Sequence, residues 1–167
     1  MRQEKFKKIV LPLTNKLFRI AFNITGNKED AEDAVQDTLF NLWRKKDKWD
    51  TIENLEAYCF RSVRNISLDK LALKANQTQP IPLGFDHPTG EDDIQSQIEK
   101  KEEMAELEEL LHRLPEKQRT IFLLREIENL SYKEIALVMD ITEEQVKVGL
   151  FRTRQKLRMY FEELRNG

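Results

Sequence analysis

Two helix starts lie close together near the end of the chain, and their spacing constrains the fold more than any other feature. Ser131 and Glu134 fit a capping box, in which each side chain bonds the backbone N–H of the other residue, and Thr142 and Gln145 fit a second one. Asp140, between them, tolerates the left-handed backbone angles of a tight turn. A short helix, a tight turn and a second helix predict a helix-turn-helix.

The charges of the second helix indicate what this motif contacts. Its segment 147–158 has no acidic residue and five basic ones: Lys147, Arg152, Arg154, Lys156 and Arg158. Cationic ends of this kind meet phosphates, and the first residues of the helix, 142–145, are placed to meet base edges. The pattern favours reading of duplex DNA. The plainer alternative is a solvated charged helix in an ordinary bundle.

The composition of the chain indicates its fold class and its cellular compartment. Charged residues make up 35% of the chain and only five residues are glycine, which favours an all-helical protein. The single cysteine, Cys59, excludes an intrachain disulfide and suits a reducing cytosol. The first apolar run is interrupted by Pro12, Lys16 and Arg19, so we expect no signal peptide and no membrane insertion.

The N-terminal part predicts three helices. Apolar residues at helical spacing predict the first over 3–25, closed by Gly26. A second runs from Asn27 or Lys28 to Trp43, and a third from about 55 to 74, after a polar loop at 44–54 that carries Trp49.

Acidic residues crowd the start of the second helix, with Asp30, Asp33 and Asp37 on one face. Three interpretations stay open. The carboxylates compensate the helix dipole, they bind a metal (although no histidine is near), or they form a docking face for a basic partner.

The third helix interleaves aromatic and basic side chains: Tyr58, Phe60, Arg61, Arg64 and Asn65. Aromatic faces beside arginines are typical of proteins that stack and hold single-stranded nucleic acid. The alternative for Tyr58 and Phe60 is that their rings belong to the core.

Residues 75–98 break the helical pattern with prolines and glycines and predict a linker. Charge is uneven around it: the net charge is +4 over 1–85, −8 over 86–109 and +2 over 110–167. A helix is expected to start within 99–109, and Pro115 is expected at the first position of another. His87 and His112 are isolated, so no zinc site and no nucleophilic dyad can be assembled.

Together these motifs resemble the bacterial RNA polymerase sigma factors of the extracytoplasmic-function (ECF) branch, which keep only regions two and four. Region two is resembled by 17–21, 25–39, Trp43 and 57–65. Region four is resembled by 114–119, 130–136 and the helix that continues to Leu157. A helix-turn-helix alone occurs in many regulators, but both motifs in this order and at this spacing are specific.

The resemblance implies three sets of site residues. Core-polymerase binding is implied for Asp33, Gln36, Asp37 and Phe40. Melting of the −10 element and binding of its single strand are implied for Trp49, Tyr58, Phe60, Arg61, Arg64 and Asn65. Duplex binding at the −35 element is implied for Ser131, Tyr132, Thr142, Glu143, Glu144, Gln145, Lys147, Arg152 and Arg154.

It also implies an organisation and partners. We expect two small helical domains: region two at 1–74, an acidic linker at 75–100 that threads toward the polymerase active site, and region four at 101–167. The expected partners are core RNA polymerase, promoter DNA and an anti-sigma factor, with a monomer when free, and no enzymatic activity, cofactor or metal. Two other classes remain: a helix-turn-helix regulator with a dimerisation or sensing lobe, and an enzyme that uses the carboxylates of 29–37.

Four positions depart from the family pattern. Tyr58 stands where tryptophan is frequent, Asp140 where glycine is usual, and Val148 and Gly149 where a serine–arginine pair is usual. Loss of that arginine removes one phosphate contact, and a glycine inside a helix costs about 1 kcal/mol relative to alanine. We therefore expect weaker or differently aimed duplex binding.

Overall fold

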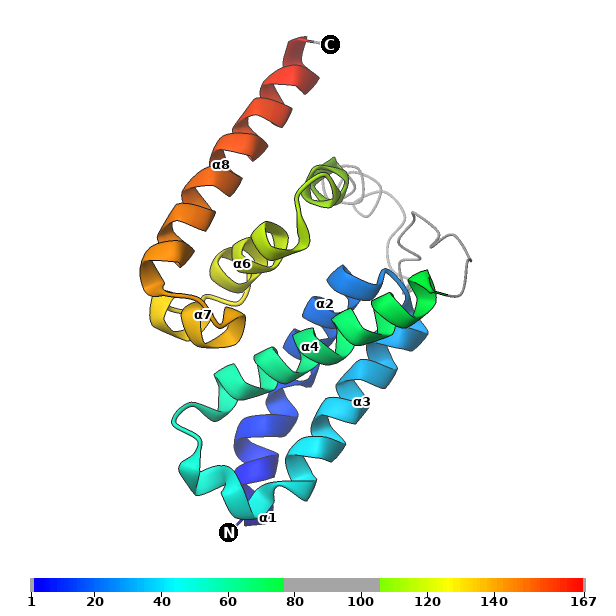
Figure 1. Cartoon of the computed structure of the whole chain (residues 1–167), viewed down its shortest axis with the longest axis vertical. Helices are drawn as coiled ribbons and strands as arrows, with labels where there is room; N and C mark the ends of the chain where they lie inside the picture. The colour runs from blue at the N-terminus through cyan, green and yellow to red at the C-terminus, as the bar shows by residue number, and fades with distance from the viewer. Residues whose placement is uncertain (1, 77–105, 167) are drawn as a thin grey trace, which may run out of the picture.

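The computed structural model describes residues 2–76, which we call the first lobe, and 106–166, the second lobe. Every regular element within these two ranges is a helix, which confirms the all-helical prediction (Figure 1). The predicted acidic linker and His87 lie outside the described residues.

The first predicted helix is interrupted. It is divided into α1 (Arg2–Lys5), the π-helical η1 (Phe6–Val10), the 3-10 helix η2 (Leu11–Leu13) and α2 (Thr14–Thr25). The prediction of one regular helix over 3–25 is therefore wrong. Pro12 has no N–H and its ring crowds the preceding turn, so the chain there changes its helical type.

The remaining helices of the first lobe begin where the sequence predicts. Gly26 ends α2 with φ of 68°, and the side chain of Asn27 accepts a hydrogen bond from the Asp30 N–H to start α3 (Lys28–Arg44). The predicted loop at 44–54 contains a 3-10 helix, η3 (Lys46–Thr51). Asn54 then caps α4 (Leu55–Ala75).

The second lobe starts with a helical segment at 106–112 and continues with α6 (Glu116–Glu126), α7 (Tyr132–Met139) and α8 (Glu143–Asn166). Pro115 lies at the N-cap of α6, one residue before its predicted place. Both capping boxes of the helix-turn-helix are formed, at Ser131 and Thr142. Asp140 adopts the left-handed conformation, with φ of 57° and ψ of 48°.

The two lobes share one apolar core. Helices α2, α3 and α4 pack together, and α7 packs on the side of α4 (Figure 1). The cluster of buried residues is continuous from Leu17 and Phe60 in the first lobe to Ile135 and Leu150 in the second. A smaller cluster joins the segment 106–112 to the middle of α8.

Within the described ranges, no helix combines the length and the apolar character that a bilayer crossing requires.

Two glycines should respond oppositely to alanine. A Cβ at Gly149 would meet Ile121 Cδ1 at 3.4 Å, an ordinary contact, whereas Gly26 has a positive φ. We expect Gly149→Ala to raise the free energy of unfolding by about 0.5–1 kcal/mol, since alanine favours the helix. Gly26→Ala should lower it by about 1 kcal/mol or more. Urea denaturation followed by circular dichroism measures both, and equal signs would contradict the geometry.

Candidate nucleic-acid interfaces

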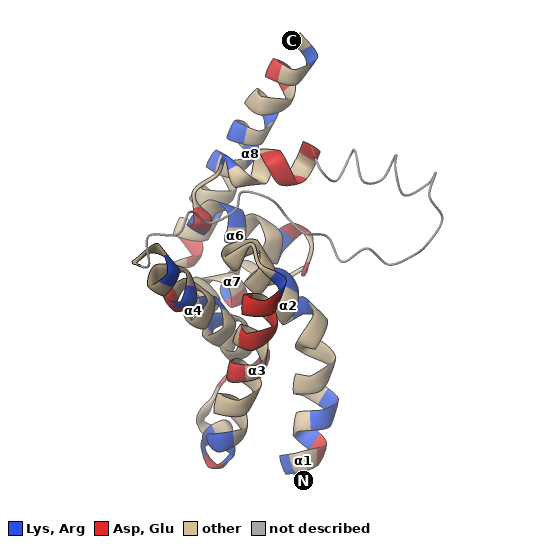
Figure 2. Ribbon diagram, turned by 90° about the vertical axis from the view of Figure 1, so that its right-hand side faces the viewer, with Lys and Arg blue, Asp and Glu red and all other residues tan. Residues whose placement is uncertain are grey.

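One face of α3 offers acidic groups around an exposed ring. Asp33, Gln36, Asp37 and Phe40 follow one another at helical spacing and are all exposed. Phe40 is 61% exposed, and the guanidinium of Arg44 lies 5.3 Å from the centre of its ring. Figure 2 shows the acidic start of α3. The arrangement suits a partner with basic and apolar side chains.

Lysines of α4 occupy two of the carboxylates that were candidates for a metal. Lys74 pairs with Asp30, and Lys70 Nζ lies 3.3 Å from Asp37 Oδ2. Among the described residues, no group of three or more His, Cys, Asp or Glu could hold a metal ion. Ion pairing is thus the arrangement that the structure gives these carboxylates.

A second candidate surface lies along α4. Tyr58, Arg61 and Asn65 are spaced for one helical face; Arg61 and Asn65 are exposed and Tyr58 is partly exposed. Lys45 Nζ donates to the Tyr58 hydroxyl at 3.3 Å, which brings a further cation to the ring. These residues combine stacking area with positive charge.

Two predicted stacking residues are not on this surface. Trp49 is 2% exposed, its indole N–H donates to the Leu42 carbonyl at 2.9 Å, and its ring packs on those of Phe6 and Trp43. Phe60 is fully buried in the shared core. In this arrangement each ring fills the core and presents no face to solvent, so the burial of Trp49 and Phe60 does not support the prediction that they contact DNA bases.

Arg64 is in place on α4 but is already engaged. Its side chain is 10% exposed, and Nε and Nη2 donate to the two carboxylate oxygens of Glu116 at 2.8 and 2.9 Å. The hydroxyl of Thr120 donates to the same carboxylate at 2.9 Å.

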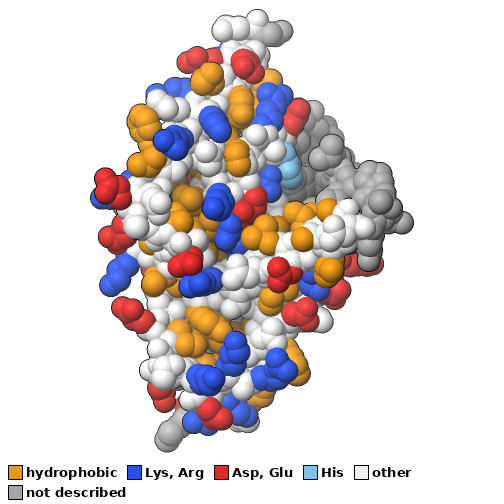
Figure 3. Space-filling view, in the orientation of Figure 1, with side chains coloured by type: hydrophobic (Ala, Val, Ile, Leu, Met, Phe, Trp, Pro, Cys, Tyr) orange, Lys and Arg blue, Asp and Glu red, His pale blue; other side chains and the backbone are white. Residues whose placement is uncertain are grey.

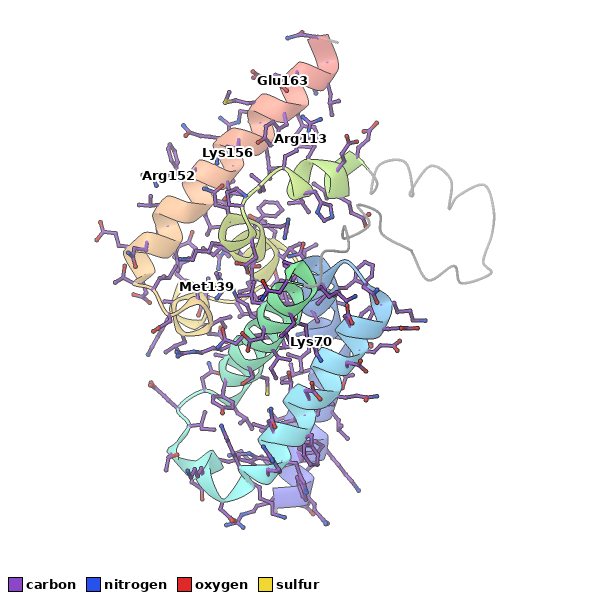
Figure 4. All side chains as sticks on the ribbon, turned by 45° about the vertical axis from the view of Figure 1, so that its right-hand side comes forward. Lys70, Arg113, Met139, Arg152, Lys156 and Glu163 are labelled. Atoms are coloured by element: carbon purple, nitrogen blue, oxygen red, sulfur yellow. The ribbon has the colours of Figure 1, made fainter. Side chains whose placement is uncertain are left out.

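A third candidate surface is the start of α8. Residues 142–145 are exposed, and a surface hollow is lined by Gln118, Thr142, Glu144, Gln145, Val148, Gly149 and Arg152. Figure 4 shows Arg152 and Lys156 on α8, and Figure 3 shows basic and apolar side chains in the upper part of the molecule, along α8. At this surface the exposed first residues of α8 lie beside the basic side chain of Arg152.

The cations around α8 differ in how they are held. Lys147 lies 5.9 Å and Arg125 4.6 Å from the centre of the Tyr132 ring. Arg154 pairs with Glu126 at 2.7 Å, which raises the pKa of the guanidinium, and Lys156 donates to Gln118 at 3.2 Å. Ser131 is exposed at the start of α7, where its backbone N–H and hydroxyl fix the capping box.

Burial and hydrogen bonding shift the pKa of two other groups in opposite directions. Burial raises the pKa of the Cys59 thiol to about 12, so the thiol stays protonated at neutral pH. For Glu134, burial raises the pKa, but hydrogen bonds from Ser131 and Asn54 outweigh it and the pKa of the carboxyl is lowered.

Sequence reasoning missed the acids of the second lobe that face arginines of the first. Glu116, Glu128 and Asp140 pair with Arg64, Arg19 and Arg61 respectively. The partners lie 52 residues or more apart in the chain, so no local pattern in the sequence could pair them.

Family models match both lobes. A model of sigma-70 region 2 matches residues 9–77, and a model of sigma-70 region 4 matches residues 104–157.

Among sequence relatives, the ECF RNA polymerase sigma factor SigE of Mycolicibacterium smegmatis is 29% identical over 148 residues, which cover 87% of this chain and 57% of the relative. SigW of Bacillus subtilis is 24% identical over 175 residues, 97% of this chain and 91% of that protein. The chain thus spans little more than half of the first relative and most of the second.

A solved structure has a similar fold. It is the sigma factor RpoE from Bartonella quintana in complex with the anti-sigma factor NepR, with a TM-score of 0.76, 22% identity, and coverage of 95% of this chain and 98% of that one.

The buried position of Trp49 predicts a stability role. Trp49→Ala should lower the free energy of unfolding by about 3–5 kcal/mol, because it leaves a cavity beside the rings of Phe6 and Trp43. Phe40→Ala is the matched control: it removes an exposed ring and should change stability by about 0.5 kcal/mol or less. Urea denaturation compares the two, and similar small effects would mean that Trp49 is not a core residue.

Proposed function

The chain belongs to the ECF RNA polymerase sigma factors, and we propose that it directs the polymerase to promoters through three separate surfaces. The face of α3 docks on core polymerase, the outer face of α4 holds the melted −10 strand, and the start of α8 reads the −35 duplex. The observation that carries the proposal is that both sigma regions match in order, and that the three surfaces fall within the matched ranges.

Docking on polymerase is assigned to Asp33, Gln36, Asp37 and Phe40. Their common exposed face supports this, since acids around an aromatic ring give both charge steering and an apolar anchor. Lys70 pairs with Asp37 of this face, and Lys74 pairs with Asp30 beside it. These two lysines of α4 partly neutralise the acidic side chains of α3.

Single-strand binding is assigned to Tyr58, Arg61, Arg64 and Asn65. The partly exposed Tyr58 ring supplies stacking, which contributes roughly 1–3 kcal/mol per base. The two arginines and the Asn65 amide supply contacts for phosphates and base edges. Trp49 and Phe60 are buried, so they are not assigned to this surface in this arrangement of the lobes.

Duplex binding is assigned to Ser131, Tyr132, Thr142, Glu143, Glu144, Gln145, Lys147, Arg152 and Arg154. Residues 142–145 stand at the exposed helix start, where base edges of a major groove are met in helix-turn-helix proteins. Because Val148 and Gly149 offer no cation, Lys147 and Arg152 are the nearest phosphate contacts on this helix.

The proposed domain boundaries are 1–74 and 101–167 with a linker between them. We assign the protein to the cytoplasm, where polymerase meets chromosomal DNA. An anti-sigma factor is a further partner in this proposal, supported by the similarly folded sigma factor that binds NepR.

Run-off transcription tests the proposal directly. The full chain is mixed with core polymerase and a genomic template library, and promoter-specific transcripts are expected only when both are present. A dimer that binds a palindrome without polymerase would instead indicate an ordinary helix-turn-helix regulator.

The strand surface gives a specific prediction. Tyr58→Ala in the holoenzyme should lower the fraction of open promoter complexes about tenfold or more, because a stacking face is lost. Tyr160→Ala, a tyrosine of α8 that lies near Arg113, is the matched control and should leave opening unchanged. Permanganate reactivity of thymines in the −10 element measures opening; equal effects of the two variants would remove Tyr58 from the site.

The duplex surface gives another prediction. Arg152→Ala should weaken binding of −35 duplex and reduce the slope of log affinity against log salt by about 1, since one phosphate contact is lost. Arg165→Ala, near the end of α8, is the control and should keep the wild-type slope. Fluorescence anisotropy over a salt series measures both, and an unchanged slope for Arg152→Ala would show that it contacts no phosphate.

A further inference from the structure

One side of α8 carries an apolar centre that has no part in the proposed DNA contacts. We call this side the outer face, and it consists of Glu144, Gln145, Val148, Phe151 and Arg152, all of which are exposed. Val148 is 42% and Phe151 is 62% exposed. The opposite side, with Val146 and Leu150, is buried toward α6 and α7, and Figure 1 shows α8 at the edge of the molecule. The outer face is thus open to a partner as broad as duplex DNA.

Helical geometry makes Val148 the centre of the outer face. Residues three and four positions apart are neighbours on a helix, so Val148 adjoins Glu144 and Gln145 on one side. By the same spacing it adjoins Phe151 and Arg152 on the other side. Gln145, Val148 and Arg152 also line the same surface hollow. A duplex that meets Gln145 and Arg152 therefore also covers Val148.

The chemistry of valine restricts which base it can select. Its side chain has no donor or acceptor, so it cannot satisfy the polar edges that guanine, cytosine and adenine present in the major groove. Covering such an edge with Val148 would remove water from groups that gain no partner, which lowers affinity. The C5 methyl group of thymine is the one apolar group that a base presents there. Val148 is therefore suited to thymine and disfavours the other three bases.

Local structure holds Val148 in place for such a contact. A branched Cβ leaves valine one strongly preferred rotamer in a helix, so the contact costs little side-chain entropy. The capping box of Thr142 and Gln145 fixes the start of the same helix through hydrogen bonds of 2.9 and 3.1 Å. Gly149, next to Val148, has no side chain that would hold the helix away from the floor of a groove. A short side chain can therefore approach a base edge closely.

We propose that Val148 is a specificity-determining residue, which selects thymine at one position of the −35 duplex by packing its methyl groups on the thymine C5 methyl. The inference rests on the proposed function of α8 and adds a base preference to it. Phosphate contacts carry no sequence information, whereas contacts to base edges do. With Val148 and Gly149 in place of a serine and an arginine, the chain exchanges a phosphate contact for the selection of one base.

The test removes only the methyl group of each thymine in turn. A −35 duplex is first selected from a randomised pool by the full chain with core polymerase, and each thymine of either strand is then replaced by deoxyuridine. At the contacted thymine the replacement should weaken binding about fourfold, the effect of exposing one buried methyl(ene) group. Competition binding to the holoenzyme, followed by fluorescence anisotropy, compares the duplexes.

A substitution then connects this methyl group to the side chain. Val148→Ser should keep the fold, because serine and valine have similar helix propensities, and circular dichroism checks this. This variant should bind the thymine and deoxyuridine duplexes equally at that position. Met159→Ser is the matched control, since Met159 is also exposed on α8, at 60%, but lies about 16 Å farther along the helix. The control should keep the fourfold difference.

The inference is overturned if the selected duplex has no preferred thymine or if no replacement by deoxyuridine weakens binding of the wild type. It is also overturned if the loss persists unchanged in Val148→Ser. Promoter-specific run-off transcripts from the wild type, together with any of these results, would leave the proposed function in place and remove only the base contact. If no such transcripts appear, the proposed function fails, and this inference fails with it.

Discussion

Packing of α4 on two sides is the constraint on which the rest of the structure depends. One side of α4 lies against α2 and α3, and the other lies against α7 of the second lobe. Burial on both sides stabilises the helix but removes much of its surface from solvent, including Phe60 and most of Arg64. The helix that carries the proposed strand contacts is thus also the helix that joins the lobes.

Local signals in the sequence predicted the helix ends well. The helix ends are set by contacts with atoms a few residues away, so they can be predicted without knowing the fold. This holds for Gly26, Asn27, Ser131 and Thr142. The interruption at Pro12 was equally local, but the apolar spacing around it outweighed it in the prediction of one helix.

Long-range packing explains why the burial of several predicted site residues could not be predicted from the sequence. Trp49 looked like an exposed loop aromatic because nothing near it in sequence shows that Phe6 and Trp43 close around it. Phe60 lies on α4 beside residues that face outward but belongs to the shared core, and Arg64 is paired with Glu116 of the second lobe; no pattern local to α4 shows either. The exposed face of α3 could be predicted because helical spacing alone sets it.

The buried thiol of Cys59 can serve as a probe of local unfolding in the first lobe. Cys59 is the single cysteine of the chain and is buried on α4, the helix that packs against both lobes. Its pKa of about 12 leaves almost no thiolate at neutral pH. An alkylating reagent can therefore react with Cys59 only after the packing of the first lobe around α4 opens locally. The rate of Cys59 alkylation would therefore report how often this core opens locally, independently of the surface residues.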